Sequence, residues 1–404
     1  MARYRLSLSL AASAVALAAL FGGAAPGYAQ QAVETKAREA LLLDYETGTV
    51  LLNKNADERM PPSSMSKLMT AVMIFDRLKE GSLSLDEKFR VSQNAWKTGG
   101  AASGSSTMFL HPNQEVRVED LLRGIIIQSG NDACITVAEN LLGSEAAFAE
   151  AMNRRAKEIG LTGSHFMNAT GLPDENHYMT PRDLAKLGRF IMERFPEYFS
   201  IYSEKEFSYN NIRQHNRNPL LYTMPGADGM KTGHTSVAGY GLTATAKIDD
   251  RRQILVINGL DTMAARSDEA QKLMDWGFRN FENRTLFTKG EVVNTAGVWL
   301  GDADEVQLVA DHDLRFTLPR RAAQNLDVKV VYNGPIPAPI TKGQQIARLV
   351  VNGTDMPTPL EVPLVAATDV DRLGFFGRLG AAAQHLIFGH AQKQIESVAS
   401  AVKQ

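Results

Sequence analysis

The sequence predicts an α/β chain with two folded parts, a larger one that mixes helices with paired strands and a smaller one built only of strands. The chain has 404 residues, which is more than one average domain needs. Apolar residues recur at helical spacing in several segments between residues 65 and 195. Beyond about residue 283, short apolar segments alternate with turns rich in glycine and proline, a pattern typical of strands.

The composition is that of an ordinary globular protein. Hydrophobic residues make up 44% and charged residues 22%, which excludes a disordered or collagen-like chain. The formal net charge is −2, so there is no electrostatic reason to expect nucleic acid as a partner. A single cysteine excludes an internal disulfide and a zinc site built on cysteines. This residue, Cys134, lies in an apolar stretch and is expected to be buried, and no motif implies a metal or another cofactor.

The first 29 residues have the layout of a bacterial secretory signal. Arg3 and Arg5 precede an apolar run over residues 6–21, and small residues come next, among them Gly27 and Ala29. The apolar run is short for a helix that spans a bilayer. We therefore expect cleavage after Ala29 and a mature protein that works outside the cytoplasm, in the periplasm. No later run of about 18 apolar residues indicates a spanning helix.

A buried helix is predicted soon after the start of the mature chain. Pro61-Pro62 breaks the chain, and Ser63 or Ser64 is placed to cap a helix that begins there. Apolar residues over 65–79 recur at helical spacing and cover a broad face, so this helix is expected to be buried and to end at Gly81.

The remaining elements are predicted from the same periodicities. Apolar runs around turns predict a hairpin over residues 41–52 and paired strands over 239–260, with a basic turn at Arg251-Arg252. Further helical regions are predicted over residues 121–142, 147–159 and 181–195. The resulting divisions are 1–29 for the signal, 30–283 for the larger domain, 285–365 for the all-β domain, and 369–404 for a segment that returns to helical spacing.

One pair of residues stands out as a nucleophile and its base. No HExxH motif and no G-x-S-x-G motif is present, so a zinc protease and a nucleophile elbow are unsupported. In Ser64-Met65-Ser66-Lys67, the serine and the lysine are three residues apart on one helix face. A serine hydroxyl needs a base, and a lysine serves when burial or a neighbouring cation favours its neutral form. Unpaired N–H groups at the helix start favour the developing anion.

Two further short motifs fit beside this pair, Ser129-Gly130-Asn131 and Lys231-Thr232-Gly233. Each motif is weak by itself, because the same patterns recur elsewhere, as at Ser92–Asn94. Their order and settings make the combination specific. Ser129 lies in a break between two apolar helical runs, and Lys231 comes just before the apolar strands.

With these residues in place, the sequence resembles the serine D-alanyl-D-alanine carboxypeptidases, a group of low-molecular-mass penicillin-binding proteins. The resemblance covers roughly residues 38–390. It rests on the three motifs and on longer stretches around and between them: residues 62–70, Met108-Phe109-Leu110, residues 128–134, Gly171-Leu172, Asn216-Arg217-Asn218, residues 231–235 and Trp276-Gly277-Phe278.

The resemblance implies a fold and a mechanism. The fold is an antiparallel sheet flanked by helices, followed by a β-rich stalk. Ser64 is the nucleophile that attacks the bond between two terminal D-alanines, and Lys67 accepts its proton. Ser129 relays a proton, and Asn131 binds the substrate amide. Lys231 and Thr232 of the K-T-G motif, which ends in Gly233, bind the substrate carboxylate. The backbone N–H groups of Ser64 and His234 form an oxyanion hole.

Two substrate-binding candidates are open to a second interpretation. His234 titrates near neutral pH and is a candidate base, although its place directly after K-T-G favours a structural or backbone role. Arg217 is either a second carboxylate anchor or an arginine that braces a surface loop.

The C-terminal segment is expected to be an amphipathic helix in the membrane interface, followed by a polar tail. Apolar residues, among them Val370, Phe375 and Phe376, accompany Arg372 and Arg378. Three consecutive alanines at 381–383 provide little apolar area, so weak attachment to the outer face of the cytoplasmic membrane is expected. The alternative is a helix that packs on the protein itself.

The leading hypothesis is a D-Ala-D-Ala carboxypeptidase that acts on peptidoglycan stem peptides and is inhibited covalently by β-lactams. A DD-endopeptidase that cuts cross-links would use the same residues. A β-lactamase is less favoured, because its glutamate segment, E-x-x-L-N, is matched only loosely by Glu206–Asn210, with Tyr209 in place of leucine. A silent wall-binding protein would not need an intact nucleophile and base.

Overall fold

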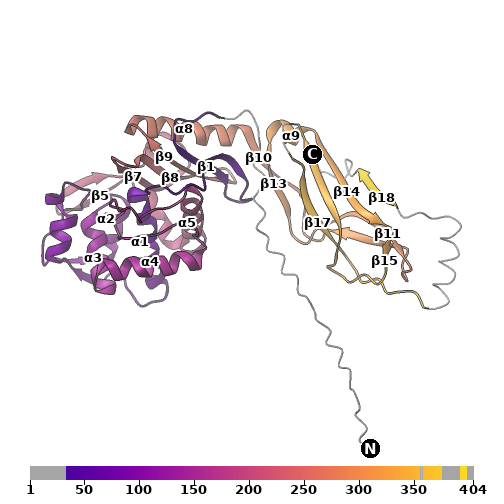
Figure 1. The fold of residues 1–404 in the computed structure, drawn as a ribbon, viewed down its shortest axis with the longest axis horizontal. Coiled ribbons are helices and arrows are strands. Elements are labelled where there is room, and N and C mark those ends of the chain that lie inside the picture. Colours follow the sequence, from indigo (N-terminus) through magenta and orange to yellow (C-terminus); the bar gives the residue numbers. More distant parts are fainter. Residues whose placement is uncertain (1–32, 355, 357, 375–391, 398–404) are drawn as a thin grey trace, which may run out of the picture.

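The computed structural model describes residues 33–354, 356, 358–374 and 392–397. These residues form two bodies side by side, a mixed helix and strand domain and an all-β domain (Figure 1). The predicted fold class is confirmed. The predicted signal, residues 1–29, lies outside the described residues. Among the described residues, none of the helices combines the length and the apolar character needed to cross a bilayer.

The first domain is built on one antiparallel sheet of five strands in the order β2-β1-β9-β8-β7. The predicted hairpin and paired strands are both part of it. β7, which carries the K-T-G motif, is an edge strand. The bounds are β1 Glu39–Asp44, β2 Val50–Lys54, β7 Ala227–Thr235, β8 Gly239–Ile248 and β9 Arg251–Leu260.

Alternating side chains of β9 bury both faces of this sheet. Ile254 and Val256 belong to the large core shared with the helical layer, whereas Leu255 and Ile257 pack with Leu273 of α8 (Met263–Asn280). Figure 1 shows α8 on one side of the sheet and α1–α5 on the opposite side. α8 was not predicted from the sequence. Its buried stripe is narrow and mixed with charged residues, so periodicity alone gives a weak signal.

The helical layer confirms the predicted helices. The region predicted over 121–142 is two helices, α2 and α3, and the break between them holds Ser129. The bounds of the main helices are α1 Lys67–Lys79, α2 Val118–Ile126, α3 Asn131–Leu142, α4 Glu145–Ile159 and α5 Pro181–Arg194. The shorter elements are η1 Ser63–Ser66, η2 Ala95–Gly99, η3 Ala101–Ser103, α6 Pro196–Phe199, η4 Ser200–Ser203, α7 Leu220–Thr223, and the hairpins β3 Lys88–Arg90 with β4 Glu115–Arg117 and β5 Glu206–Tyr209 with β6 Ile212–His215.

Two local predictions were wrong. Neither Ser63 nor Ser64 caps α1, because a 3₁₀ turn, η1, precedes the helix and its serine side chains bond elsewhere. The turn between β8 and β9 is Asp249-Asp250 rather than the arginine pair, and Asp249 takes the positive φ of 54°. Arg251 is instead buried in β9, where it donates to the Phe281 carbonyl oxygen.

The all-β domain comes after α8 in the chain. Its main sheet has seven strands in the order β15-β11-β12-β17-β16-β14-β18, and β10 pairs with β13 beside it. Leu308, Val330 and Leu349 are fully buried members of its core. The bounds are β10 Phe281–Phe287, β11 Val292–Trp299, β12 Glu305–Val309, β13 Leu314–Pro319, α9 Arg320–Gln324, β14 Leu326–Gly334, β15 Ile336–Pro337, β16 Gln345–Gly353, β17 Leu360–Ala366 and β18 Gln392–Ser397.

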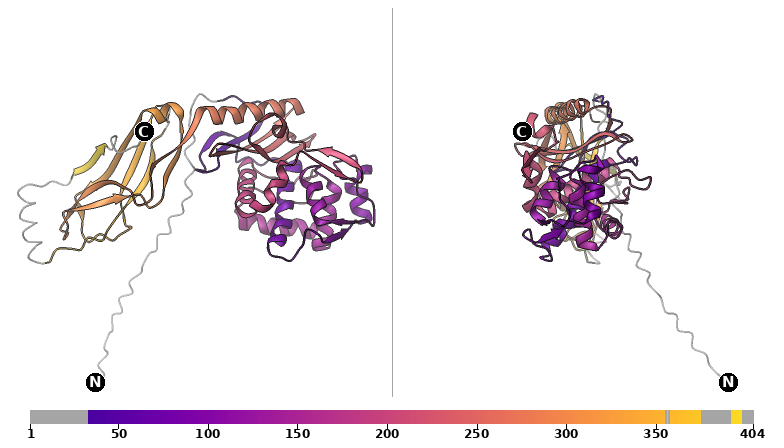
Figure 2. Two further views of the ribbon diagram at one scale, coloured as in Figure 1. Left: turned by 180° about the vertical axis from the view of Figure 1, so that it is seen from behind. Right: turned by 90° about the vertical axis from the view of Figure 1, so that its left-hand side faces the viewer.

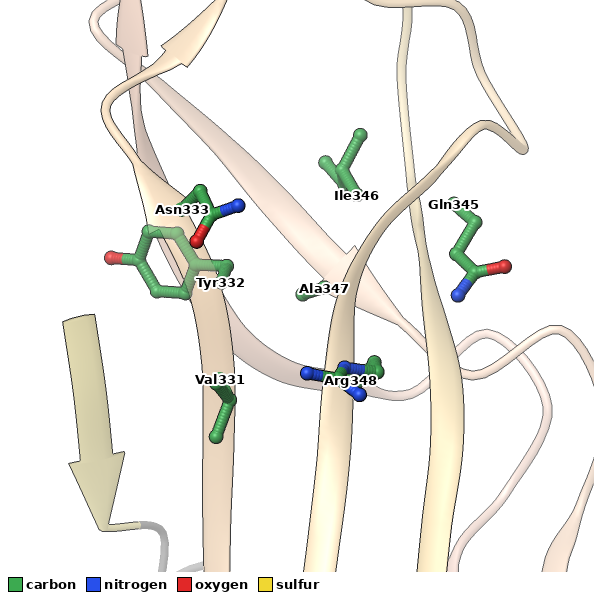
Figure 3. Close-up of a pocket in the computed structure, with 7 residues that line it drawn as sticks. All are labelled: Val331, Tyr332, Asn333, Gln345, Ile346, Ala347 and Arg348. Carbon is green, nitrogen blue, oxygen red and sulfur yellow. The ribbon is translucent and has the colours of Figure 1, made fainter. Parts of the chain in front are cut away.

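A cavity of about 360 Å³ opens on the all-β domain, lined by residues 331–333 of β14 and 345–348 of β16 (Figure 3). Hydrogen bonds join the two domains, among them one between the hydroxyls of Thr47 and Thr317 and one from Asn283 to Asp44. In Figure 1 and in the left view of Figure 2, the β10–β13 ribbon lies between α8 and the main sheet of the all-β domain.

The described part of the C-terminal segment differs from the helical prediction for 369–404. Val370 pairs with Ile340 and is buried in the core of the all-β domain, and Arg372 bridges to Gly301. Gln392–Ser397, predicted as polar tail, forms strand β18 beside β14, whose free edge offers backbone partners. Residues 375–391, where most of the predicted amphipathic helix falls, lie outside the described residues.

Candidate active site

The three sequence motifs meet in one cleft of about 450 Å³ between the edge of the sheet and the helical layer. Ser64 lies in η1, Ser129 lies in the loop before α3, and Lys231 lies on β7. Six predicted site residues line the cleft: Ser64, Ser129, Arg217, Thr232, Gly233 and His234. Lys67, Asn131 and Lys231 are buried next to it.

Lys67 and Ser64 are in hydrogen-bond contact, as their spacing predicts. The distance from Lys67 Nζ to Ser64 Oγ is 2.9 Å. Nζ also donates to Asn131 Oδ1 at 2.7 Å and to the carbonyl oxygen of Thr170 at 2.5 Å. Three acceptors therefore match the three donors of a lysine ammonium. When the amine is neutral, it has a lone pair, and the serine hydroxyl becomes the donor.

Burial decides the charge of Lys67. Its side chain is 1% exposed, and this burial lowers the pKa to about 8. Arg217 is the cation that adds to this lowering. Burial is also the main cause of the lowered pKa of Lys231, and like-charge repulsion from Lys67 adds to it. A neutral amine beside a serine hydroxyl is a general base.

Ser129 is held in a constrained position. Its φ is 62°, in the left-handed region that non-glycine residues rarely adopt. The side chain is 1% exposed, and among the described residues its Oγ has no hydrogen-bond partner. Buried hydroxyls are normally paired, so a serine that lines a cleft without a partner is arranged for a ligand.

Asp132, which directly follows the S-x-N motif, holds the loop that contributes Ser106 to the cleft. Its buried carboxylate accepts hydrogen bonds from the Thr107 hydroxyl at 2.6 Å and from the backbone N–H groups of Met108 and Leu110. The side-chain amide of Asn131 donates to Ser105 at 2.9 Å. The loop over residues 105–110 is therefore fixed against the start of α3, next to the cleft.

Gly233 allows η1 to approach β7. A Cβ at this position would lie 2.8 Å from the carbonyl oxygen of Pro62 and 3.1 Å from the Ser63 Cβ atom. Ser63 and Thr235 also share a hydrogen bond at 3.2 Å across the same contact. The glycine thus allows Ser64 to lie beside the edge strand. This packing role is additional to the substrate-binding role expected from the sequence.

His234 and Arg217 both line the cleft and are both exposed. The His234 ring stacks on Tyr240 with centroids 3.9 Å apart, and, within the described part of the chain, no contact places it as the base of Ser64, a position that Lys67 occupies. Arg217 donates to the Ser106 hydroxyl at 2.5 Å, so it braces a loop while its guanidinium faces the cleft.

Several groups at the site were not predicted from the sequence. Ser105 and Ser106 orient Asn131 and Arg217, and Arg266 of α8 lines the cleft and donates to the carbonyl of Arg217. The Thr170 carbonyl holds Lys67. The sequence feature that indicates the turn presenting this carbonyl is Asn168. Its side-chain oxygen accepts hydrogen bonds from the backbone N–H groups two and three residues later, in an Asx-type turn.

The structure places neither Cys134 nor Glu206 as a reacting group of the cleft. Cys134 is fully buried, and this burial raises the pKa of its thiol to about 12, which makes it inert. Glu206, the loose match to a β-lactamase glutamate, lies on the β5–β6 hairpin and pairs with Arg213 at 2.6 Å, and it does not line the cleft. Among the described residues, no cluster of three or more metal-ligating side chains occurs.

Comparison with known proteins agrees with this geometry. Residues 26–262 match the family described as D-alanyl-D-alanine carboxypeptidase, and residues 281–372 match the penicillin-binding protein 5 C-terminal domain. The chain belongs to the D-alanyl-D-alanine carboxypeptidase family.

Individual relatives share most of the chain. D-alanyl-D-alanine carboxypeptidase DacC of Escherichia coli is 41% identical over 87% of this chain and 89% of its own. The structure of penicillin-binding protein 5 from Haemophilus influenzae is 36% identical, covers 84% of this chain and 98% of its own, and has a TM-score of 0.73. The ampicillin-bound penicillin-binding protein D2 of Listeria monocytogenes is 30% identical, covers 62% of this chain and 100% of its own, and has a TM-score of 0.53.

The turn that presents the Thr170 carbonyl gives a stability prediction. Gly171 has a φ of 79°, and a Cβ there would lie 2.0 Å from the Ser63 carbonyl oxygen. We expect Gly171→Ala to lower the free energy of unfolding by about 3 kcal/mol, because backbone strain and overpacking add. Denaturant unfolding measures this change.

The matched control is Gly160→Ala, at a φ of 82° with no atom within 4 Å of the added Cβ. It should cost only about 1 kcal/mol. Equal losses for the two variants would contradict the steric argument.

Proposed function

We propose that this protein is a serine D-Ala-D-Ala carboxypeptidase that removes the terminal D-alanine from peptidoglycan stem peptides through an acyl-enzyme on Ser64. The observation that carries the proposal is the contact between Ser64 and a buried Lys67 whose pKa is lowered to about 8. The family to which the chain belongs supports the substrate class.

Acylation begins when the neutral Lys67 amine accepts the Ser64 hydroxyl proton. The serine oxygen attacks the carbonyl carbon between the two D-alanines, and the negative charge develops on the carbonyl oxygen. The backbone N–H groups of Ser64 and His234 are proposed to stabilise that oxygen. The C–N bond then breaks, and Ser129 passes a proton to the leaving amine. The free D-alanine departs, and the remaining peptide stays on Ser64 as an ester.

Basic residues of the cleft match the substrate's free carboxylate. Arg217 and Arg266 line the cleft, and Lys231 is buried next to it. Thr232 adds a hydroxyl donor. A guanidinium forms paired hydrogen bonds to a carboxylate, which makes these residues suited to a peptide C-terminus.

In the second step of the reaction, the ester on Ser64 is hydrolysed. A water molecule, activated by Lys67, displaces the Ser64 oxygen, which regains its proton.

We further propose a location from the sequence. Residues 1–29 direct export and are removed, and the C-terminal segment attaches the mature protein to the outer face of the cytoplasmic membrane. The charge and apolar pattern of both segments supports this proposal.

The nucleophile is tested by mass spectrometry of purified residues 30–404 with L-Lys-D-Ala-D-Ala, with and without benzylpenicillin. We expect release of one D-alanine, and a penicilloyl adduct on Ser64 that blocks it. Ser64→Ala should remove the adduct and lower turnover by at least about 10³-fold, because no other group replaces the nucleophile.

Ser82→Ala, an exposed serine distant in sequence from the motifs, should leave both signals unchanged. An adduct without D-alanine release would favour the endopeptidase. Folded protein with neither signal would indicate a silent wall-binding protein.

The lowered pKa of Lys67 predicts a pH dependence. Lys67 is a base only when it is neutral, and its fraction in that form rises as the pH rises through about 8. The second-order rate of acylation by benzylpenicillin should therefore increase with pH to a plateau, with an inflection near 8. Stopped-flow quenching of protein fluorescence measures this rate.

Lys67→Ala should acylate at least about 10²-fold more slowly and without this inflection. An unchanged inflection in the variant would remove Lys67 as the base.

Membrane attachment is tested on the intact chain. Phe375→Ser with Phe376→Ser removes apolar area from the predicted anchor, so the variant should lose sedimentation with phosphatidylethanolamine–phosphatidylglycerol vesicles while its peptidase activity stays normal. The control, Trp96→Ser, removes an aromatic side chain that is 38% exposed in the catalytic domain and should not change sedimentation. Vesicle binding that survives the double substitution would contradict the anchor.

A further inference from the structure

One carboxyl group close to the base has no part in the mechanism proposed above. Glu145 is the first residue of α4; its side chain is half-buried and does not line the cleft. Its Oε1 atom accepts the backbone N–H of Ala169 at 3.0 Å. The next residue, Thr170, presents the carbonyl oxygen that accepts from Lys67. Glu145 therefore holds the neighbour of a residue that holds the base.

The backbone before the Thr170 carbonyl is fixed by three different side chains. Glu145 holds the N–H of Ala169, and the hydroxyl of Thr70, from α1, donates to the Ala169 carbonyl oxygen at 2.7 Å. The side-chain oxygen of Asn168 accepts the N–H of Thr170 at 3.1 Å. Because each residue has only two soft backbone dihedral angles, these bonds leave the Thr170 carbonyl little freedom to turn away from the lysine.

Glu145 also acts on Lys67 through its charge. Among the described residues, no hydrogen bond or ion pair joins the two side chains, yet the carboxylate favours the ammonium form and raises the pKa of Lys67 against the larger lowering by burial. Burial raises the pKa of Glu145, and Glu139 adds to the rise, whereas the Ala169 N–H and Lys67 favour the ionised form. Water screens charges in such surroundings weakly.

Other ionisable groups also interact electrostatically with Lys67: Arg217, Lys231, Cys134, Asp132 and His177. Burial raises the pKa of Cys134 to about 12 and lowers that of His177 to about 4, so both are uncharged near pH 8. Arg217 lowers the pKa of Lys67. These groups set the background against which the two carboxylates act.

The two carboxylates that raise the pKa of Lys67 differ in what else they hold. Asp132 uses both oxygens to accept the Thr107 hydroxyl and two backbone N–H groups, so an amide cannot replace it. Glu145 accepts the Ala169 N–H with one oxygen. Its charge can therefore be removed while its hydrogen bond is kept.

We propose that Glu145 is a positioning residue for the reaction: it holds the turn that presents the Thr170 carbonyl to Lys67, and its negative charge favours the protonated form of that lysine. The hydrogen bond fixes where the amine lies, and the charge sets the pH at which the amine becomes a base. This assignment rests on the proposed function, because it takes Lys67 as the base of Ser64.

Glu145→Gln separates the two roles. The amide oxygen still accepts the Ala169 N–H, so the turn stays in place, but the negative charge is gone. The ammonium form of Lys67 loses an attractive interaction, so its pKa falls. The inflection in benzylpenicillin acylation should therefore move to lower pH by about half a unit. The plateau rate should stay within about twofold, since the base is only slightly weaker.

Glu145→Ala removes the acceptor together with the charge. The Ala169 N–H loses its partner, and the Thr170 carbonyl is no longer fixed. We expect the same downward shift of the inflection and a plateau at least about tenfold lower, because a small misplacement of a catalytic group costs a large factor in rate. Glutamine thus rescues the plateau that alanine loses.

Thr70→Val removes the other bond to Ala169 without changing a charge. It should lower the plateau and leave the inflection near that of the unmodified enzyme. The matched control is Glu150→Gln, which removes an exposed charge from the same helix and should change neither quantity. All rates are measured by stopped-flow fluorescence on variants whose folding is verified by circular dichroism.

Two results would overturn the role of Glu145. One is an inflection in Glu145→Gln at the same pH as in the unmodified enzyme. The other is a plateau that falls as far in Glu145→Gln as in Glu145→Ala, which would make the hydrogen bond irrelevant.

Lys67→Ala distinguishes these results from a failure of the proposed function. If the inflection persists without Lys67, or if the unmodified enzyme forms no adduct, the proposed function fails, and the role of Glu145 fails with it. If the inflection depends on Lys67 but Glu145→Gln does not move it, the role of Glu145 fails alone.

Discussion

The burial of the Lys67 amine is the constraint on which the site depends. A lysine removed from water must either be paired with acceptors or lose its proton. The Lys67 ammonium is paired with three acceptors, and its lowered pKa allows it to lose a proton. Its three partners come from η1, the start of α3 and the turn at Thr170. Because these segments are distant in sequence, the base exists only when the whole helical layer is packed. Stability and chemistry are therefore linked at one nitrogen atom.

The edge strand β7 supplies the second half of the site. An edge strand has unpaired backbone groups on one side, and here that side faces the nucleophile rather than another strand. Gly233 removes the side chain that would hold η1 away, so the strand and the serine approach closely. Two cationic side chains, Arg217 and Arg266, line the same cleft as Ser64. Their charge suits a peptide with a free C-terminal carboxylate.

The all-β domain and the C-terminal segment show where patterns in the sequence mislead. Apolar and basic residues over 369–404 suit a helix, yet Val370 is buried in the β core and 392–397 pairs with β14. Short strands are specified by the partners that cover them, and these partners lie far away in the chain. The helix α8 was not predicted for a similar reason. Its narrow buried stripe can be recognised only from the sheet face that it covers.

The sequence by itself determined the motifs, their order, the helices around them and the family resemblance. The Ser64–Lys67 contact was predictable because helix geometry is local, so a spacing of three residues places both on one face. Only the tertiary structure decided that burial is the main cause of the lowered pKa of Lys67, that Ser129 lacks a partner among the described residues, and that Arg217 and Arg266 line the same cleft as Ser64. These properties depend on desolvation and on contacts between distant segments, which no local pattern records.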